Sequence, residues 1–227
     1  MPQNIYDDSG FFAGYARLRR SVDGLDGAPE WPTLKSMLPG MAGKRVIDLG
    51  CGFGWFCRFA REAGAATVLG LDVSANMLAR AREMTSDAAI TYRQADLETL
   101  ELPAAAFDLA YSSLTLHYLE KLGALFATVH RALAPGGHFV FSAEHPLYTE
   151  PGPDYLDEGP RTTDWLTKGV IKQHRTIATY FALLRRTGFA VTHLDEWGPS
   201  PEQVAAQPDL ALERERPPFL IMACRRA

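Results

Sequence analysis

Residues 46–59 read VIDLGCGFGWFCRF, an apolar segment that runs into three alternating glycines and then into a second partly apolar segment. Val46, Ile47 and Leu49 favour a buried strand. The glycines at positions 50, 52 and 54 lack the Cβ atoms that would block close approach of the backbone. A strand that ends in a glycine turn and continues as a helix is typical of sites for nucleotide-like cofactors, and this stretch predicts such a site.

An acidic residue after the next predicted strand indicates how a ribose would be bound. Residues 68–71 are a short apolar segment that ends at Asp72, 18 residues beyond Gly54. A carboxylate at about that separation from a glycine loop can accept hydrogen bonds from both ribose hydroxyls. Asp is also common where a strand passes into a turn, so a purely structural role is the alternative.

The spacing of the glycines separates two classes of cofactor. The dinucleotide pattern G-x-G-x-x-G, counted from Gly50, requires glycine at position 55, where this chain has Trp55. An indole there would be a poor neighbour for a pyrophosphate at a helix N-terminus. The pattern that is present, D-x-G-x-G-x-G from Asp48 to Gly54, resembles the glycine loop of the class I S-adenosylmethionine (SAM) methyltransferases.

Later segments resemble the same family in the same order, so that the resemblance covers about residues 44–143. They include Phe107–Ser113, similar to the fourth strand of the family, and Leu133–Gly137, similar to its L-x-P-G-G turn before a strand over 138–142. The resemblance implies that SAM contacts Asp48, Gly50, Cys51, Gly52, Asp72, Val73, Met77, Asp96, Leu97 and Ser112. In it Asp72 binds the ribose, Met77 packs on the adenine, and Asp96 hydrogen-bonds the adenine amino group.

Strand and helix patterns alternate along the chain, with clear helices predicted over 55–62, 76–84, 121–133 and 176–186. Alternation favours a parallel α/β sheet with helices on both faces. The family implies a three-layer α/β/α sandwich with a seven-stranded mixed sheet whose last strand is antiparallel. We expect a single methyltransferase domain over 1–227, with the following parts: an N-terminal helical cap (1–43), a cofactor-binding core (44–143), a lid or insert (144–174), and a C-terminal helix and β-hairpin (175–227).

Two segments outside the core carry their own predictions. Residues 11–20, FFAGYARLRR, predict a helix, and the resemblance implies that it closes over the cofactor. Residues 145–164, rich in proline and other turn formers, predict a loop or lid.

Composition limits the classes of partner. The chain has 23 basic and 27 acidic residues, a formal charge of −4, which gives no electrostatic reason to expect nucleic acid as substrate. Three cysteines without a C-x-x-C pair predict neither a disulfide framework nor a metal site, which fits a reducing cytoplasm. No apolar run approaches the 18 or so residues of a membrane helix, so we expect no membrane insertion. Monomer and homodimer both remain open.

Two histidines are candidates for a general base, which the reaction needs only when the acceptor arrives with a proton on its nucleophile. His117 follows the fourth predicted strand and His145 follows the fifth. Carboxyl ends of strands are where open α/β sheets bind ligands, and imidazole titrates near neutral pH. The alternative for His117 is to cap its helix or to line the methionine end of the cofactor site.

Four residues are candidates for contact with the acceptor. Tyr15 and Arg20 lie on the predicted N-terminal helix and can meet an acidic group, although a solvated arginine is the commoner case. Trp31 and Tyr148 can enclose a planar or cationic molecule, although core packing is the commoner use of aromatic residues.

Together these features predict a SAM-dependent methyltransferase acting on a small molecule, most similar to the broad group that includes the ubiquinone and menaquinone methyltransferases. The Asn/Asp-Pro-Pro-aromatic motif of nucleobase and glutamine methylation is absent after strand four, where the chain reads Tyr111-Ser112-Ser113-Leu114. A non-catalytic SAM-binding or scaffold protein stays open as an alternative. A NAD-dependent oxidoreductase is a second one, against which Trp55 counts.

Overall fold

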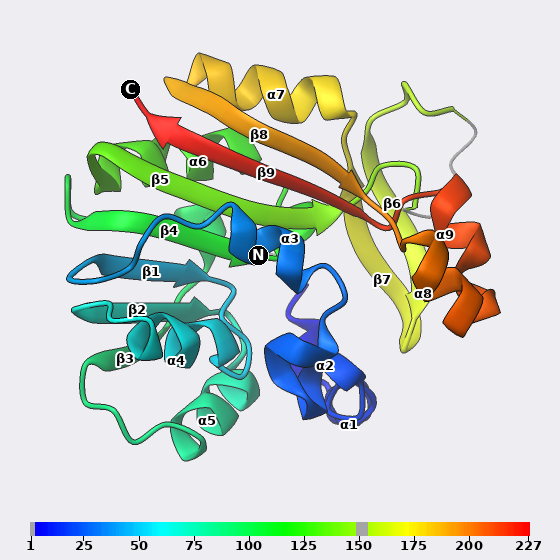
Figure 1. Ribbon diagram of the computed structural model, residues 1–227, viewed down its shortest axis with the longest axis horizontal. Helices are drawn as coiled ribbons and strands as arrows, with labels where there is room; N and C mark the ends of the chain where they lie inside the picture. Colours follow the sequence, from blue (N-terminus) through cyan, green and yellow to red (C-terminus); the bar gives the residue numbers. More distant parts are fainter. Residues whose placement is uncertain (1–2, 149–153) are drawn as a thin grey trace.

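The computed structural model describes residues 3–148 and 154–227. Its main sheet has seven strands in the order β3-β2-β1-β4-β5-β9-β8 (Figure 1). The strands are β1 (Arg45–Leu49), β2 (Thr67–Asp72), β3 (Ile90–Gln94), β4 (Phe107–Ser113), β5 (Leu133–Glu144), β8 (Phe189–Trp197) and β9 (Phe219–Arg226). The first five pair in parallel, and β9 lies antiparallel between β5 and β8. The predicted mixed sheet with an antiparallel last strand is confirmed.

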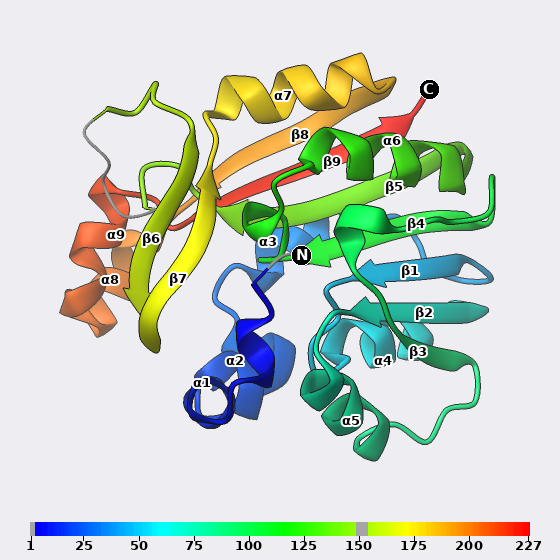
Figure 2. The same ribbon diagram turned by 180° about the vertical axis from the view of Figure 1, so that it is seen from behind.

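Helices cover both faces of this sheet (Figures 1 and 2). One face is covered by α3 (Trp31–Ser36), α4 (Trp55–Glu62) and α5 (Ala75–Glu83), the other by α6 (Leu122–Ala132) and α7 (Ile177–Arg186). Each face has its own apolar core, because the side chains of a strand alternate between the two sides. On the first face Phe56 stacks on Tyr111 with ring centroids 3.5 Å apart, and on the second Phe126 packs edge-on against Phe139. The two cores lie between the sheet and the helices on either side of it, which makes the fold a three-layer sandwich.

The glycine turn between β1 and α4 is fixed to the end of the neighbouring strand. The backbone N–H groups of Gly50 and Cys51 both donate to the carbonyl oxygen of Leu71, at 2.8 Å. Gly54, the residue before α4, has φ of +73°, and a Cβ there would lie 2.1 Å from the hydroxyl of Tyr92. Glycine is required at this position both by the left-handed backbone and by the lack of space.

The turn predicted over Leu133–Gly137 lies inside a strand. It belongs to β5, which begins directly after α6, and it forms an irregularity in the pairing with β4. The register moves from Phe107 opposite Leu133 to Leu109 opposite His138. The extra residues, including Gly136 at φ of +74°, fold the chain tightly on itself, since a Cβ on Gly137 would lie 2.8 Å from the carbonyl oxygen of Ala134.

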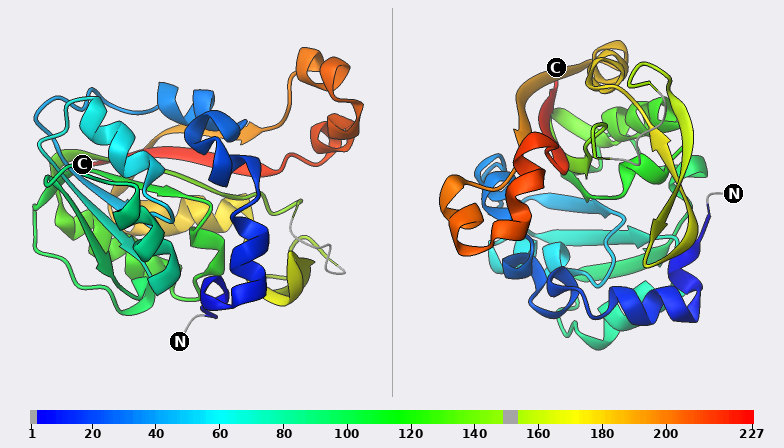
Figure 3. Two further views of the ribbon diagram at one scale, coloured as in Figure 1. Left: turned by 90° about the horizontal axis from the view of Figure 1, so that it is seen from below. Right: turned by 90° about the vertical axis from the view of Figure 1, so that its right-hand side faces the viewer.

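The predicted loop over 145–164 is partly wrong. Residues 149–153 lie outside the described part of the chain, but β6 (Gly159–Trp165) pairs antiparallel with β7 (Thr167–His174) as a separate two-stranded sheet (Figure 3). The polar composition of β6 concealed the strand from the sequence pattern. Leu166, at φ of +58°, connects the two strands.

The predicted helix over 11–20 is interrupted. It is divided into α1 (Ser9–Tyr15) and α2 (Arg19–Val22), because Leu18 adopts an extended conformation. With the short helices η1 (Ile5–Asp7) and η2 (Gly24–Gly27), these elements lie at the end of the sheet where the parallel strands finish (Figure 3). Residues 3–27 are called the cap below.

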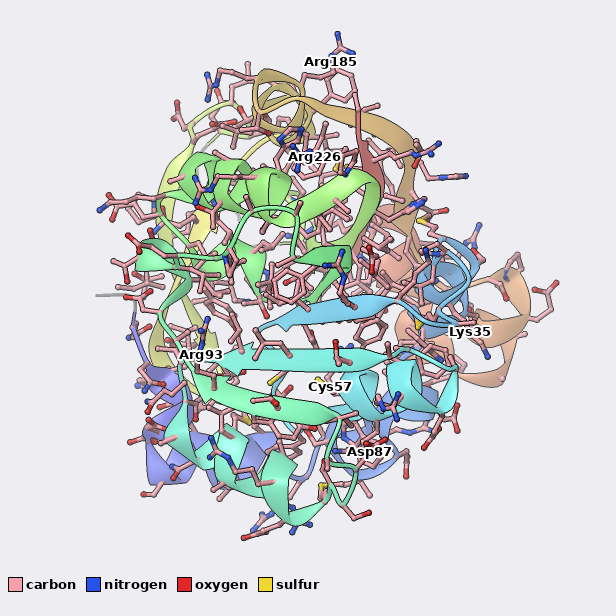
Figure 4. The ribbon with its side chains drawn as sticks, turned by 90° about the vertical axis from the view of Figure 1, so that its left-hand side faces the viewer. Lys35, Cys57, Asp87, Arg93, Arg185 and Arg226 are labelled. Atoms are coloured by element: carbon pink, nitrogen blue, oxygen red, sulfur yellow. The ribbon has the colours of Figure 1, made fainter. Side chains whose placement is uncertain are left out.

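The remaining short helices connect the larger elements. They are η3 (Leu97–Thr99), η4 (Leu116–Tyr118), α8 (Pro201–Ala206), η5 (Pro208–Ala211) and α9 (Leu212–Glu215). The amino ends of the parallel strands lie at the opposite end of the sheet, where Asp87 and Arg226 are labelled in Figure 4. Within the described residues, every helix is too short or too polar to cross a membrane.

Candidate active site

A cavity of about 720 Å³ lies at the carboxyl ends of the parallel strands. Its walls come from the glycine turn, the starts of α4 and α5, the ends of β4 and β5, the cap, and β7. Ligand sites of open α/β sheets occupy this end of the sheet, and a volume of this size is in the range of small-molecule sites, about 300–1,000 Å³.

The glycine turn and Asp72 form one wall of the cavity as a single hydrogen-bonded unit. Gly52 donates its backbone N–H to Oδ2 of Asp72, and Ser74 donates its own to Oδ1, each at 2.9 Å. Burial raises the pKa of Asp72 to about 6, and these two donors oppose the shift. Gly52 has φ of +50°, and the place where a Cβ would lie is open. The turn therefore offers bare backbone to a ligand beside a carboxylate, as binding of a nucleoside requires.

Asp48 contributes a second buried carboxyl to the same wall. Its Oδ2 accepts a hydrogen bond from the thiol of Cys57 at 3.3 Å, and its pKa is raised to about 7 by burial. A cationic ligand in the cavity would favour the ionised form of this group.

The predicted cofactor residues line the cavity, with the exception of Ser112. The hydroxyl of Ser112 donates to the carbonyl oxygen of Leu49 at 2.7 Å and is fully buried between β4 and β1. Its neighbours Tyr111 and Ser113 line the cavity instead, because adjacent side chains of a strand point to opposite faces.

The adenine end of the predicted site has the expected elements. Met77 is buried on α5 and lines the cavity. Asp96 caps η3, where its Oδ1 accepts the backbone N–H of Glu98 at 2.8 Å. The open space at Gly52, the carboxylate of Asp72 and the apolar surface of Met77 together fit SAM. The assignment of each residue to one part of the cofactor stays a prediction.

The two candidate bases have different surroundings. His117 lines the cavity, and its Nδ1 accepts the backbone N–H of Glu144 at 3.1 Å. Its pKa is lowered well below the ordinary value by burial and by the nearby Lys172 and Arg175. His145 is not among the lining residues: its Nε2 pairs with Glu196 at 2.9 Å and its Nδ1 accepts the N–H of Leu147. The structure thus brings His117 to the site and gives His145 a role in joining β5 to β8.

Of the four candidate acceptor contacts, all line the cavity, but two are already engaged. The guanidinium of Arg20 pairs with the fully buried Glu30 through two contacts at 3.1 and 3.3 Å. Trp31 packs edge-on against Phe59 in the core under α3. Tyr15 and Tyr148 are the candidates whose rings contribute to the cavity wall without an ion pair or a main-core position.

Sequence reasoning missed an ion pair on the far wall. Nζ of Lys172, on β7, lies 2.5 Å from Oε2 of Glu144, at the end of β5, and both residues line the cavity. Tyr6 and Tyr118 also line the cavity, and their hydroxyls are hydrogen-bonded to each other at 3.3 Å. No sequence signal relates these four residues. Glu144 and Lys172, which form the ion pair, are 28 positions apart in the chain.

Comparison with known proteins places the chain in a family. A family model described as a methyltransferase domain matches residues 47–141. A crystal structure of a SAM-dependent methyltransferase from Mesorhizobium loti is 56% identical, covering 89% of this chain and all of that one, with a TM-score of 0.85. The chain belongs to the SAM-dependent methyltransferases. The family and its cofactor SAM are as the glycine turn predicted, and no comparison supports a NAD-dependent oxidoreductase.

Relatives of this methyltransferase differ in how much of the chain they share. An uncharacterized protein of Haemophilus influenzae is 32% identical over 251 aligned residues, 98% of this chain and 97% of its own length. A malonyl-[acyl-carrier protein] O-methyltransferase of Pectobacterium atrosepticum is 38% identical over 109 residues, and the match spans 42% of that protein. The second likeness covers less than half of either chain.

Proposed function

We propose that this methyltransferase transfers the methyl group of SAM to a small-molecule acceptor held in the inner part of the cavity. The observation that carries the proposal is that the cofactor wall and the far wall belong to one cavity. Asp72 and Met77, on β2 and α5, line it together with Trp165 and Lys172, on β6 and β7. An acceptor beside Trp165 and Lys172 is then in the same cavity as the cofactor.

When bound, SAM supplies a methyl group that its sulfonium has already activated. The chain then has to position the acceptor and to exclude water. Proximity and orientation of this kind can provide about 7 to 11 kcal/mol of a barrier. The cap supports such enclosure, because Gln3 contacts β7 through Gly169 and Ile171, and Asp7 contacts the start of α5 through Ser74.

The size of the cavity, about 720 Å³, favours a small acceptor over a macromolecule. The acidic net charge of the sequence is consistent with this choice. The proposal includes a cytoplasmic location, which rests on composition alone.

Calorimetric titration tests the cofactor part of the proposal. SAM and S-adenosylhomocysteine (SAH) are expected to bind with micromolar affinity, about −8 kcal/mol, and NAD is not expected to bind. The matched variant is Gly52→Val, which places a side chain in the open space beside the turn and is expected to abolish binding of both sulfur compounds. Binding of neither compound to the unaltered protein would contradict the proposal.

A further inference from the structure

On the far wall of the cavity, Glu144 carries a buried oxygen that the described residues leave without a hydrogen-bond partner. Oε2 of Glu144 is bound to Nζ of Lys172, but Oε1 is buried and has no hydrogen-bond partner within the described residues. The side chains of Glu144 and Lys172 are only 12% and 6% exposed. Leaving a buried acceptor unsatisfied costs about 1 to 3 kcal/mol, and more when the group is charged. Such an atom calls for a donor from outside the fold.

His117 does not donate a hydrogen bond to Oε1 of Glu144. Its ring also does not compete with Oε1 for the proton that an acceptor would release. Its Nδ1 accepts the backbone N–H of Glu144, so a neutral ring carries its hydrogen on Nε2. Burial and the neighbouring cations Lys172 and Arg175 keep the pKa of the ring well below its ordinary value. His117 is therefore a hydrogen-bond donor toward a ligand, and Glu144 is the group beside it with a free lone pair for a proton.

The space around this ion pair has aromatic walls. Nζ of Lys172 lies 5.5 Å from the ring centre of Trp165, which packs edge-on against Tyr15. Tyr6 packs edge-on against both Tyr15 and Tyr118. Edge-to-face walls of this kind suit a flat ring.

Charge selects further among flat molecules. Lys172 is already neutralised by Oε2 of Glu144, and Arg175, the other nearby cation, is not among the residues that line the cavity, so the carboxylate of an acceptor at Oε1 would meet a like charge. A neutral molecule with a hydroxyl meets no such penalty and can donate its hydrogen to Oε1.

We propose that the acceptor is a neutral, planar molecule that presents a hydroxyl group to Oε1 of Glu144, and that Glu144 is the general base of the transfer. This rests on the proposed methyltransferase function. The hydroxyl oxygen forms the new bond to the methyl carbon, the bond from that carbon to sulfur breaks with its electron pair left on sulfur, and the hydroxyl proton passes to Oε1. Positioned general bases typically contribute about 10² to 10⁴ in rate.

Binding of two matched probes to the SAH-saturated protein tests this assignment without turnover. 4-Methylphenol is neutral near neutral pH, and 4-methylbenzoate has the same ring with a carboxylate in place of the hydroxyl. We expect the phenol to bind about 10-fold or more tightly than the benzoate, a difference of about 1.4 kcal/mol. In Glu144→Gln the order is expected to reverse, because the repelling carboxylate is gone and Lys172 is left without its counter-charge. Glu83→Gln, at an exposed ion pair with Arg80, is the control and should keep the original order.

Turnover provides the second readout. With SAM, release of SAH in the presence of 4-methylphenol is expected to fall by about 100-fold or more in Glu144→Gln while SAM affinity stays within about 2-fold. Preference of the unaltered protein for the benzoate, an unchanged order in Glu144→Gln, or failure of both probes to bind while SAH binds would overturn the assignment of Glu144. Failure of SAH itself to bind would instead overturn the proposed function.

Discussion

Asp72 connects the ends of two strands by accepting the backbone N–H of Gly52 on one oxygen and that of Ser74 on the other, both at 2.9 Å. The same carboxyl lines the cavity in which SAM would bind. It holds the glycine turn in place, and we propose that it also offers its remaining lone pairs to a ligand. A substitution here acts on both.

Asp72→Asn should weaken binding of SAH. The amide of Asn keeps one acceptor oxygen but loses the negative charge. Its NH₂ group is a donor, so it faces the N–H of Gly52 or of Ser74 without forming a hydrogen bond. We expect a loss of about 1 to 3 kcal/mol in the binding free energy measured by calorimetry. Asp87→Asn is the control, since Asp87 also accepts a backbone N–H, from Ala89, at the far end of the sheet. If both variants bound SAH with equal affinity, the assignment of Asp72 to the ribose would be contradicted.

Asp48→Asn should stabilise the ligand-free protein, and by more at high pH. The folded-state pKa of Asp48, about 7, lies above the ordinary value of 3.8, so the folded chain binds more protons than the unfolded chain between these values. Stability therefore falls as pH rises through this range, and Asn removes the penalty. We expect urea unfolding to show a gain of about 1 to 3 kcal/mol at alkaline pH and a smaller gain in mild acid. The same gain at both would contradict the assigned pKa.

Asp7→Ala should loosen the cap. The carboxylate of Asp7 accepts hydrogen bonds from the hydroxyl of Ser74 at 2.5 Å and from the backbone N–H groups of Ala75 and Asn76 at 3.3 and 3.1 Å, at the positive end of the α5 dipole. We expect faster amide exchange over residues 3–15 and a loss of about 1 kcal/mol in SAH affinity. Asp8→Ala is a poor control because Asp8 caps α1, so Asp23→Ala at the exposed end of α2 serves instead. Unchanged exchange over 3–15 would show that these contacts do not hold the cap.

Arg20→Gln should destabilise the fold strongly. Its guanidinium is the ion-pair partner of Glu30, which is fully buried, and removing one member leaves a buried carboxylate without compensation. Such losses typically cost about 3 to 5 kcal/mol. Arg19→Gln is the matched control one position away: Arg19 is 82% exposed, and its pair with Asp23 should contribute less than about 1 kcal/mol. Similar denaturation curves for the two variants would contradict the structural role of the buried pair.

The core of the fold could be predicted because its signals are local. Residues 46–59 combine a strand pattern, left-handed glycines and a helix in one uninterrupted stretch, and the predicted helix over 55–62 matches α4. Where the prediction was wrong, the local pattern did not carry the information. β6 reads GPRTTDW, without the apolar alternation that indicates a strand, because its partner β7 and not the main sheet stabilises it.

In the candidate site, too, the residues with a local sequence signal were predicted and those that depend on tertiary contacts were not. The predicted contacts along the glycine turn line the cavity, because chain direction fixes which end of each strand they occupy. Ser112 does not line the cavity, because a shift of one residue reverses the direction of a side chain in a strand and its neighbours Tyr111 and Ser113 point to the cavity instead. The pair of Glu144 and Lys172 was missed altogether, because only the return of β7 over the end of β5 brings the two together. Tertiary contacts of this kind leave no periodic trace in a sequence.

The position of β9 in the sheet has a consequence for how the protein is made. Residues 219–226 fill the gap between β5 and β8, so both neighbours keep an unpaired edge until this part of the chain has left the ribosome. Unpaired edges of apolar strands recruit other chains. The nascent protein thus passes through a window in which aggregation competes with completion of the sheet. A premature stop codon in the last strand is expected to send the product to inclusion bodies or proteolysis.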